Sequence, residues 1–336
     1  AASASNSILS DKEKEEIDMV IVATESGIDQ SKAAAVFVHG LLGIQPFARS
    51  FEIKEACYGA TAALHYAKLH VENSPESKVL VIASDIAKYG VGTPGEPTQG
   101  AGSVAMLITQ NPRIMAFNND NVAQTRDIMD FWRPNYSSTP YVNGMYSTQQ
   151  YLDCLTTTWD EYKKRYDWTM DDFAAICFHL PYPKLALKGL RKMMDKNLSQ
   201  EKKDSLQENF DKSILYSQMI GNIYTGSLFL GLLSLLENAE TLKAGDKIAL
   251  YSYGSGAVSE FFSGELVEGY EAYLDKERLS KLKQRTALSV VDYEKVFFEE
   301  VQLDESGSAQ FAGYEHQDYA LVEIVDHQRR YSKVEK

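Results

Sequence analysis

The feature that most limits how this chain can fold is an order of apolar segments that occurs twice. Residues 17–108 alternate apolar, β-branched runs with helical stretches and end in a strand after a glycine-containing turn. Residues 173–266 repeat this order, again with a glycine turn before the last strand. Runs that are apolar throughout predict strands covered on both faces, and their alternation with helices predicts a layered α/β fold. We therefore expect two similar halves, residues 1–112 and 113–336.

Periodicity and turn residues predict the individual elements. The expected strands are 17–23, 47–56, 78–85, 103–109, 173–181, 246–254 and 254–266. The expected helices are 31–43, 57–72, 148–166, 184–217, 222–238 and 276–285. The segment 113–165 is rich in aromatic residues, proline and turn formers, and we interpret it as a cap over a site. The elements after residue 275 are interpreted as peripheral.

Charge and cysteine content argue against several classes of function. With 34 basic and 47 acidic residues, the net charge of −13 disfavours a general nucleic-acid or anionic-membrane surface. The longest apolar run, 228–236, is about half of the ~20 residues that a membrane span needs. The three scattered cysteines favour reduced thiols over a disulfide framework, and no Cys/His cluster indicates a metal site. We expect a soluble, cytoplasmic protein that binds no metal.

Cys57 lies where a strand-like run changes to a helical one, in the stretch "EACYGATAALHYAK". A helix N-terminus offers free N–H groups and positive potential, which lower the pKa of a thiol and favour a nucleophilic thiolate. The same groups can stabilise an oxyanion on an attached acyl group. The alternative is an inert buried thiol, which is the more common state of free cysteine. Cys154 and Cys177 are interpreted as core residues.

Polar residues occupy matching places in the two halves. Glu25 and His179 each follow the first strand of a half, and Cys57 and Asn222 each stand at the start of an apolar helix. A carboxylate whose pKa is raised in an apolar pocket can act as a general acid or base, although a solvent-facing Glu is the more common case. His179 on its own is more often structural than catalytic. Two halves that face one another would nevertheless bring all four residues together.

Lys184 and Lys188 are four residues apart and therefore share one face of the helix beyond His179. Such a pair can hold phosphates at the mouth of a pocket, although a solvated helix face is the default interpretation. The remaining histidines lie on helical or peripheral stretches and receive no role: His39, His65, His70, His316 and His327.

Eight ordered motifs make the sequence resemble a known family. They are "DMVIVATES", "EACYGAT", "SDIAKYG", "GEPTQGAGSVAM", "DFWRP", "CFHLPYPK", "GNIYTGS" and "SYGSG". Together they resemble hydroxymethylglutaryl-CoA synthase, most closely its shorter bacterial form. The resemblance implies the thiolase-like fold, with two pseudo-repeated halves in a layered α/β/α/β/α arrangement. It also implies that the first half, 1–112, lacks the family's opening strand.

The resemblance implies an acyltransferase that condenses acetyl-CoA with acetoacetyl-CoA and water to give 3-hydroxy-3-methylglutaryl-CoA and CoA. Cys57 would take the acetyl group as a thioester. Glu25 would remove a methyl proton as base and return a proton to the new tertiary alkoxide as acid, and His179 would orient and polarise the acetoacetyl group. The positions that match substrate-binding residues of the family are Tyr89, Thr98, Lys184, Lys188, Asn222 and Ser255.

Further properties implied by the resemblance are a homodimer, a place in the mevalonate pathway of isoprenoid biosynthesis, and no cofactor beyond the CoA thioesters that serve as substrates. Two other hypotheses remain open. The chain could be a ketoacyl synthase of the same fold, with a Cys57–His179–Asn222 triad, or a non-catalytic thiolase-fold subunit. Glu25 distinguishes the ketoacyl synthase, because a decarboxylating enzyme needs no carboxylate base at that position.

Overall fold

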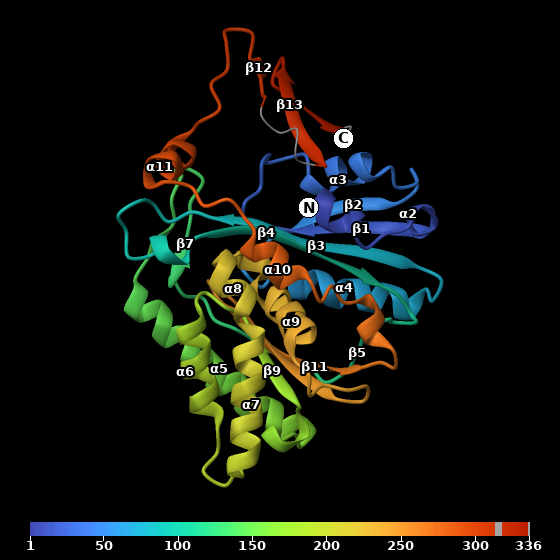
Figure 1. Ribbon diagram of the computed structural model, residues 1–336, viewed down its shortest axis with the longest axis vertical. Helices are drawn as coiled ribbons and strands as arrows, with labels where there is room; N and C mark the ends of the chain where they lie inside the picture. Colours follow the sequence, from blue (N-terminus) through green and yellow to red (C-terminus); the bar gives the residue numbers. More distant parts are fainter. Residues whose placement is uncertain (313–317, 335–336) are drawn as a thin grey trace.

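Two sheets, one from each half of the chain, form the framework of the computed structural model, which describes residues 1–312 and 318–334 (Figure 1). The first sheet contains β1 (Ile17–Ala23), β2 (Arg49–Ile53), β3 (Lys78–Ala87) and β4 (Gly100–Ile108), in the order β2-β1-β3-β4. The second contains β5 (Met115–Phe117), β6 (Val122–Thr125), β9 (Ala175–Phe178), β10 (Lys247–Gly254) and β11 (Val258–Leu266). Its order is β5-β11-β10-β9, with β6 also paired to β11.

The two sheets share a three-strand unit. In the first, β1 runs parallel to β3, which pairs with the antiparallel β4. In the second, β9 runs parallel to β10, which pairs with the antiparallel β11. The expected repeat is therefore present in the topology. The halves differ at the outer edge of the antiparallel strand. β5 and β6 both pair with β11 at this edge, whereas no strand within 1–312 and 318–334 pairs with the corresponding edge of β4.

Helices complete five layers, in the α/β/α/β/α order that the family resemblance implies. Outside the first sheet lies α3 (Ala34–Leu42), which packs on the β1 and β3 residues of one face. Between the sheets lie α4 (Gly59–Asn73) and α9 (Ser227–Asn238) (Figure 1). Outside the second sheet lie α5 (Gly144–Tyr166), α6 (Pro183–Met193) and α7 (Gln200–Ser213).

The side-chain pattern of β1 shows why a strand of this kind must be covered on both sides. Met19 and Ile21 belong to the central core with α4, whereas Val20 and Val22 belong to the outer core with α3. All four are buried, so the continuous apolar run has no solvent-facing side. The helix α9 is apolar all round for the same reason. No helix within the described residues is both long and apolar enough to span a bilayer.

The remaining elements lie around this framework. They are α1 (Ala2–Asn6), α2 (Asp11–Glu16), α8 (Leu215–Ile220), α10 (Arg278–Lys283), α11 (Val290–Phe298), β7 (Phe131–Trp132), β8 (Tyr141–Val142), β12 (Ala309–Gln310), β13 (Tyr319–Val325) and β14 (Gln328–Lys333). Short 3-10 helices cover Glu96–Thr98, Met170–Asp172, Tyr224–Gly226 and Tyr270–Tyr273. The C-terminal β13–β14 hairpin lies against the first half, where the rings of Tyr331 and Phe37 meet edge-on.

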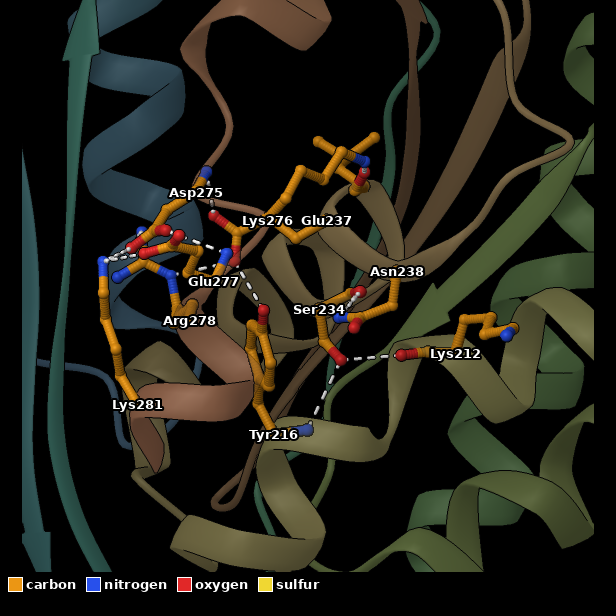
Figure 2. A network of polar contacts seen from close by, with 11 residues as sticks. Lys212, Tyr216, Ser234, Glu237, Asn238, Asp275, Lys276, Glu277, Arg278 and Lys281 are labelled. Carbon is orange, nitrogen blue, oxygen red and sulfur yellow. Dashed lines mark hydrogen bonds and ion pairs between the residues drawn. The ribbon is translucent and has the colours of Figure 1, made fainter. Parts of the chain in front are cut away.

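A buried ionic network attaches α10 to the central layer. Glu237 of α9 accepts hydrogen bonds from the hydroxyl of Tyr216 at 2.6 Å and from Nε of Arg278 at 2.8 Å (Figure 2). It also accepts one from the backbone N–H of Asp275. The carboxylate therefore joins α8, α9 and α10.

Candidate active site

Glu25 and Cys57 are in contact. The Sγ of Cys57 donates to Oε1 of Glu25 across 3.2 Å. The first sheet explains this proximity, because Glu25 follows β1, Cys57 follows β2, and these two strands are parallel neighbours. The carboxyl ends of parallel neighbours lie at one edge of a sheet. Cys57 stands directly before Tyr58, the N-cap residue of α4, as the sequence predicts.

Burial changes the proton affinity of both groups. Desolvation, followed by the charge of Asp85, raises the pKa of Glu25 to about 8. Desolvation, followed by the charge of Glu25, raises the pKa of the Cys57 thiol well above its ordinary value. The raised pKa of Glu25 agrees with the prediction. The prediction of a lowered pKa for Cys57 is wrong, because the nearest charged groups are carboxylates and desolvation outweighs the helix terminus.

Asp85 holds the loop that contains Glu25, and sequence reasoning did not single it out. Its Oδ1 accepts from the backbone N–H groups of Glu25 and Ser26 and from the hydroxyl of Thr24, at 2.8–3.0 Å. Its Oδ2 accepts from the backbone N–H and the hydroxyl of Thr225 in the other half. One feature of the sequence could have identified Asp85: it is the single charged residue in the stretch "VLVIASDIA". A buried carboxylate with this many donors rigidifies its surroundings.

Part of the predicted cap segment lies over Glu25. Nη2 of Arg133 donates to the backbone oxygen of Glu25 at 2.6 Å. A cavity of about 20 Å³ beside Glu25 has room for about one water molecule. Its lining is Glu25, Ile86, Lys88, Phe131, Arg133, Pro140 and Tyr224. In contrast, the later helix α5 of the predicted cap packs on the second sheet.

Asn222 and Tyr89, both predicted to bind substrate, are in contact across the two halves. Nδ2 of Asn222 donates to the hydroxyl of Tyr89 at 3.0 Å. The ring of Tyr89 packs against Phe131 and Tyr224, which line the Glu25 cavity. The backbone oxygen of Thr98 accepts a hydrogen bond from the backbone N–H of Asn222, whereas the Thr98 hydroxyl donates to the backbone oxygen of Gly95. Tyr89 and Asn222 are therefore next to the cavity residues.

His179 follows β9 and is held by its backbone, because its N–H donates to the oxygen of Tyr251 at 2.7 Å. The imidazole is 2% exposed, and desolvation lowers its pKa to about 3, so it is neutral. Among the described residues, its buried Nδ1 has no hydrogen-bond partner. The adjacent strand β10 ends at Gly254, whose backbone abuts Tyr58 beside Cys57. His179 therefore stands at the edge of the second sheet that faces the Cys57 turn.

The other predicted substrate-binding residues are Ser255, close to the Cys57 turn, and two lysines at the surface. Ser255 follows Gly254 at the end of β10. Lys184 and Lys188 are exposed on α6, which begins four residues after His179. Cys154 and Cys177 are buried core residues, as expected, and His316 lies outside the described residues.

Comparisons with known proteins agree with this geometry. Two family models match: the N-terminal domain of hydroxymethylglutaryl-coenzyme A synthase over residues 7–113, and its C-terminal domain over 121–214 and 190–330. The hydroxymethylglutaryl-CoA synthase of Enterococcus faecalis is 55% identical over 306 residues, which are 90% of this chain and 79% of that protein. The polyketide 3-hydroxy-3-methylglutaryl-ACP synthase PksG of Bacillus subtilis is 33% identical, over 86% of this chain and 73% of that protein.

Solved structures show the same relationship. A crystal structure of HMG-CoA synthase complexed with CoA superposes with a TM-score of 0.98 at 67% identity, covering 99% of this chain and 86% of that chain. The structure of MvaS in complex with 3-hydroxy-3-methylglutaryl coenzyme A superposes with a TM-score of 0.80 at 32% identity, covering 95% and 82%. The thiolase-like fold predicted from the motifs is confirmed, and this chain belongs to the hydroxymethylglutaryl-CoA synthase family.

Proposed function

We propose that this chain condenses acetyl-CoA with acetoacetyl-CoA and water to 3-hydroxy-3-methylglutaryl-CoA, and that Cys57 and Glu25 perform the chemistry. The observation that supports this assignment is the 3.2 Å contact between Sγ of Cys57 and Oε1 of Glu25, which also lines the small cavity described above. Membership of the family makes the chain a condensing acyltransferase, and the contact supports the choice of these two residues.

In the first step, the sulfur of Cys57 displaces CoA from acetyl-CoA. One thioester replaces another, the thiol proton is transferred to the departing CoA sulfur, and the methyl protons stay acidic. Glu25 then removes a methyl proton, and the resulting enolate carbon attacks the C3 ketone of acetoacetyl-CoA. Glu25 returns the proton to the new alkoxide, and water hydrolyses the bond to Cys57. A carboxylate with a pKa of about 8 suits both proton transfers near neutral pH.

His179 is proposed to hydrogen-bond the acetoacetyl group. Its support is a neutral, buried ring with one nitrogen unpartnered among the described residues. Asn222 and Tyr89 are proposed to line the acyl site, with Thr98 and Ser255 beside them. Lys184 and Lys188 are proposed to contact the phosphates of coenzyme A, because both ammonium groups are exposed on one face of α6. The proposed reaction needs no metal or further cofactor.

The acetyl donor is proposed to be acetyl-CoA rather than an acyl carrier protein. PksG, the relative above that is named for ACP chemistry, is 33% identical, whereas the E. faecalis CoA enzyme is 55% identical. Mixing the protein with equal amounts of acetyl-CoA and acetylated carrier protein, followed by mass spectrometry, tests this. Acetylation from CoA at a higher rate supports the proposal, and a preference for the carrier protein contradicts it.

The contact between Cys57 and Glu25 also favours this reaction over decarboxylative condensation. A ketoacyl synthase obtains its carbanion by losing carbon dioxide and has no use for a base at the nucleophile. We test the assignment with Glu25→Ala: Cys57 should still be acetylated, while condensation should stop. Continued condensation by the variant would instead support the Cys57–His179–Asn222 mechanism.

We propose a homodimer as well. Exposed apolar side chains near the edge strand β2 support it: Phe47 is 91% exposed, Tyr66 is 49% exposed, and Tyr66 packs on Phe51 of β2. Apolar patches of this kind mark interfaces. Light scattering should give twice the chain mass, and Phe47→Asp should lower it. A monomeric wild type would contradict the proposal.

The cellular setting is likewise proposed. All three cysteines are free thiols, which supports a reducing compartment such as the cytoplasm. Family membership supports a place in the mevalonate pathway. Growth of a cell that depends on this chain for mevalonate supply tests the pathway assignment.

A further inference from the structure

A buried carboxylate, Glu260, links the two halves of the molecule beside Cys57. Glu260 lies on β11, and its side chain is 1% exposed. Its Oε2 accepts a 2.6 Å hydrogen bond from the hydroxyl of Tyr58, and its Oε1 lies 2.8 Å from Nε2 of His65. Removing a carboxylate from water is costly unless polar groups compensate it. Of these two contacts from the first half, the one from Tyr58 is a hydrogen bond to Glu260, whereas Oε1 accepts no hydrogen bond among the described residues.

Tyr58 and His65 fix one helix at two points. Tyr58 is the N-cap residue of α4, and His65 follows seven residues later, so both lie on the same face, two turns apart. The ring of His65 also packs edge-on against Phe262 of β11. One carboxylate of the second half therefore lies against α4 at its N-cap and again two turns later.

The position of Cys57 depends on this helix start. Cys57 directly precedes Tyr58 and directly follows Ala56. Ala56 has a φ of +41°, in the left-handed region that residues other than glycine rarely adopt. A Cβ on Gly254 would lie 2.6 Å from the backbone nitrogen of Tyr58, so the second half also encloses the turn closely. A displaced Tyr58 would consequently change the 3.2 Å separation between Cys57 and Glu25.

The Tyr58 hydroxyl is fixed as the donor. Burial, followed by the charge of Glu260, raises the pKa of Tyr58 above its ordinary value, so the phenol stays protonated. The 2.6 Å bond therefore joins β11 to the residue that directly follows Cys57, with the phenol as donor and the carboxylate as acceptor.

We infer that Glu260 is a positioning residue for Cys57: it holds Tyr58, with His65 as its second contact, so that the thiol faces its acyl donor. The inference rests on the role proposed above for Cys57. Glu260 acts through Tyr58 and is not assigned a contact with substrate.

The molecule contains a matched control. Glu237 is also 1% exposed in its side chain, also accepts from a tyrosine hydroxyl at 2.6 Å, and also has a second side chain, Arg278, at 2.8 Å (Figure 2). Its tyrosine, Tyr216, lies on α8, and the network joins elements of the second half only. Breaking it removes the same kind of interaction away from Cys57.

The experiment compares Tyr58→Phe and Glu260→Gln with Tyr216→Phe and Glu237→Gln in the full chain. Acetylation of Cys57 is followed by rapid quenching and mass spectrometry over a range of acetyl-CoA concentrations. Alkylation of Cys57 by iodoacetamide is measured in parallel, because it needs no acyl donor. Thermal unfolding shows that each variant is folded.

We expect Tyr58→Phe and Glu260→Gln to slow the maximal acetylation rate about 10- to 100-fold, the effect of losing one hydrogen bond to a charged group. The half-saturating acetyl-CoA concentration should not change, and the double variant should be no slower than the slower single one. The Tyr216 and Glu237 variants should lose melting temperature but keep the wild-type rate. Equal rates in all four variants, or equal losses in both pairs, would overturn the inference.

The two proposals fail separately. A wild type that takes no acetyl group would contradict the function proposed for Cys57. Alkylation would then still decide the positioning role: slower alkylation in Tyr58→Phe than in Tyr216→Phe would support it, and identical alkylation would contradict it.

Discussion

The strands β1 and β9 occupy matching places in their sheets, yet the residues that follow them differ in kind. After β1 comes Glu25, whose carboxylate touches the thiol of Cys57. After β9 comes His179, whose neutral ring has an unpartnered nitrogen among the described residues. The same scaffold thus places a contact between a carboxylate and a thiol in one half and a neutral, buried imidazole in the other. We propose that the first half supplies the bond-making pair, while His179 of the second half orients the acetoacetyl group.

Replacing Glu25 with Gln removes the acid–base group proposed for the first half and should have the largest effect on condensation. Condensation should fall about 10²- to 10⁴-fold, the contribution of one acid–base group, while acetylation of Cys57 continues. Spectrophotometric consumption of acetoacetyl-CoA and mass spectrometry measure the two steps. Loss of acetylation together with condensation would show that Glu25 also activates the thiol.

Replacing His179 with Ala tests the other half. Condensation should fall about 10²- to 10³-fold, because one donor to a developing oxyanion is lost. Acetylation should continue at the wild-type rate, since His179 is not part of the Cys57–Glu25 contact. If His179→Ala also blocked acetylation of Cys57, the proposed division of roles between the two halves would be contradicted.

How far the sequence predicts this site differs from residue to residue. The apolar runs at 17–23 and 173–181 predict β1 and β9, because a strand buried on both faces has a recognisable pattern. The motifs then assign the roles of Glu25 and Cys57, whereas the parallel pairing that brings them to one edge is seen in the structure. The strands and central helices follow from local patterns, and the layer order follows from the family resemblance.

Long-range packing explains what the sequence does not predict. The bonds of Asp85 to the Glu25 loop and of Glu260 to Tyr58 join residues 60 and 202 positions apart. No local pattern predicts such pairs. The wrong expectation for the pKa of Cys57 has the same origin, because the helix start was visible in the sequence, whereas the surrounding carboxylates and the burial were not.

A smaller effect should follow from the exposed lysines of α6. Lys184→Ala with Lys188→Ala should raise the KM for acetoacetyl-CoA about fivefold with kcat unchanged, the effect of about 1 kcal/mol of exposed charge interaction. Lys192→Ala is the matched control, because Lys192 lies on the same helix and pairs with Asp153. An equal change in KM for the control would show only a general loss of positive charge.

The smallest effect concerns stability and its dependence on pH. The folded-state pKa of Glu25, about 8, is raised above the ordinary value of 4.5, so the proton binds the folded chain more tightly than the unfolded one. The resulting stabilisation is complete below pH 4.5 and is lost as the pH rises toward 8. The melting temperature of Glu25→Gln should therefore be close to that of the wild type near pH 4.5. At pH 9 it should be roughly a few degrees above that of the wild type. A constant difference across this range would contradict the buried state of Glu25.

The most direct test of the account is acetylation of the wild-type chain by acetyl-CoA alone, followed by peptide mass spectrometry. We expect one acetyl group, on the peptide that contains Cys57, and none in Cys57→Ala. No adduct at all, or an adduct on Cys154 or Cys177 instead, would contradict the assignment of Cys57 as the nucleophile.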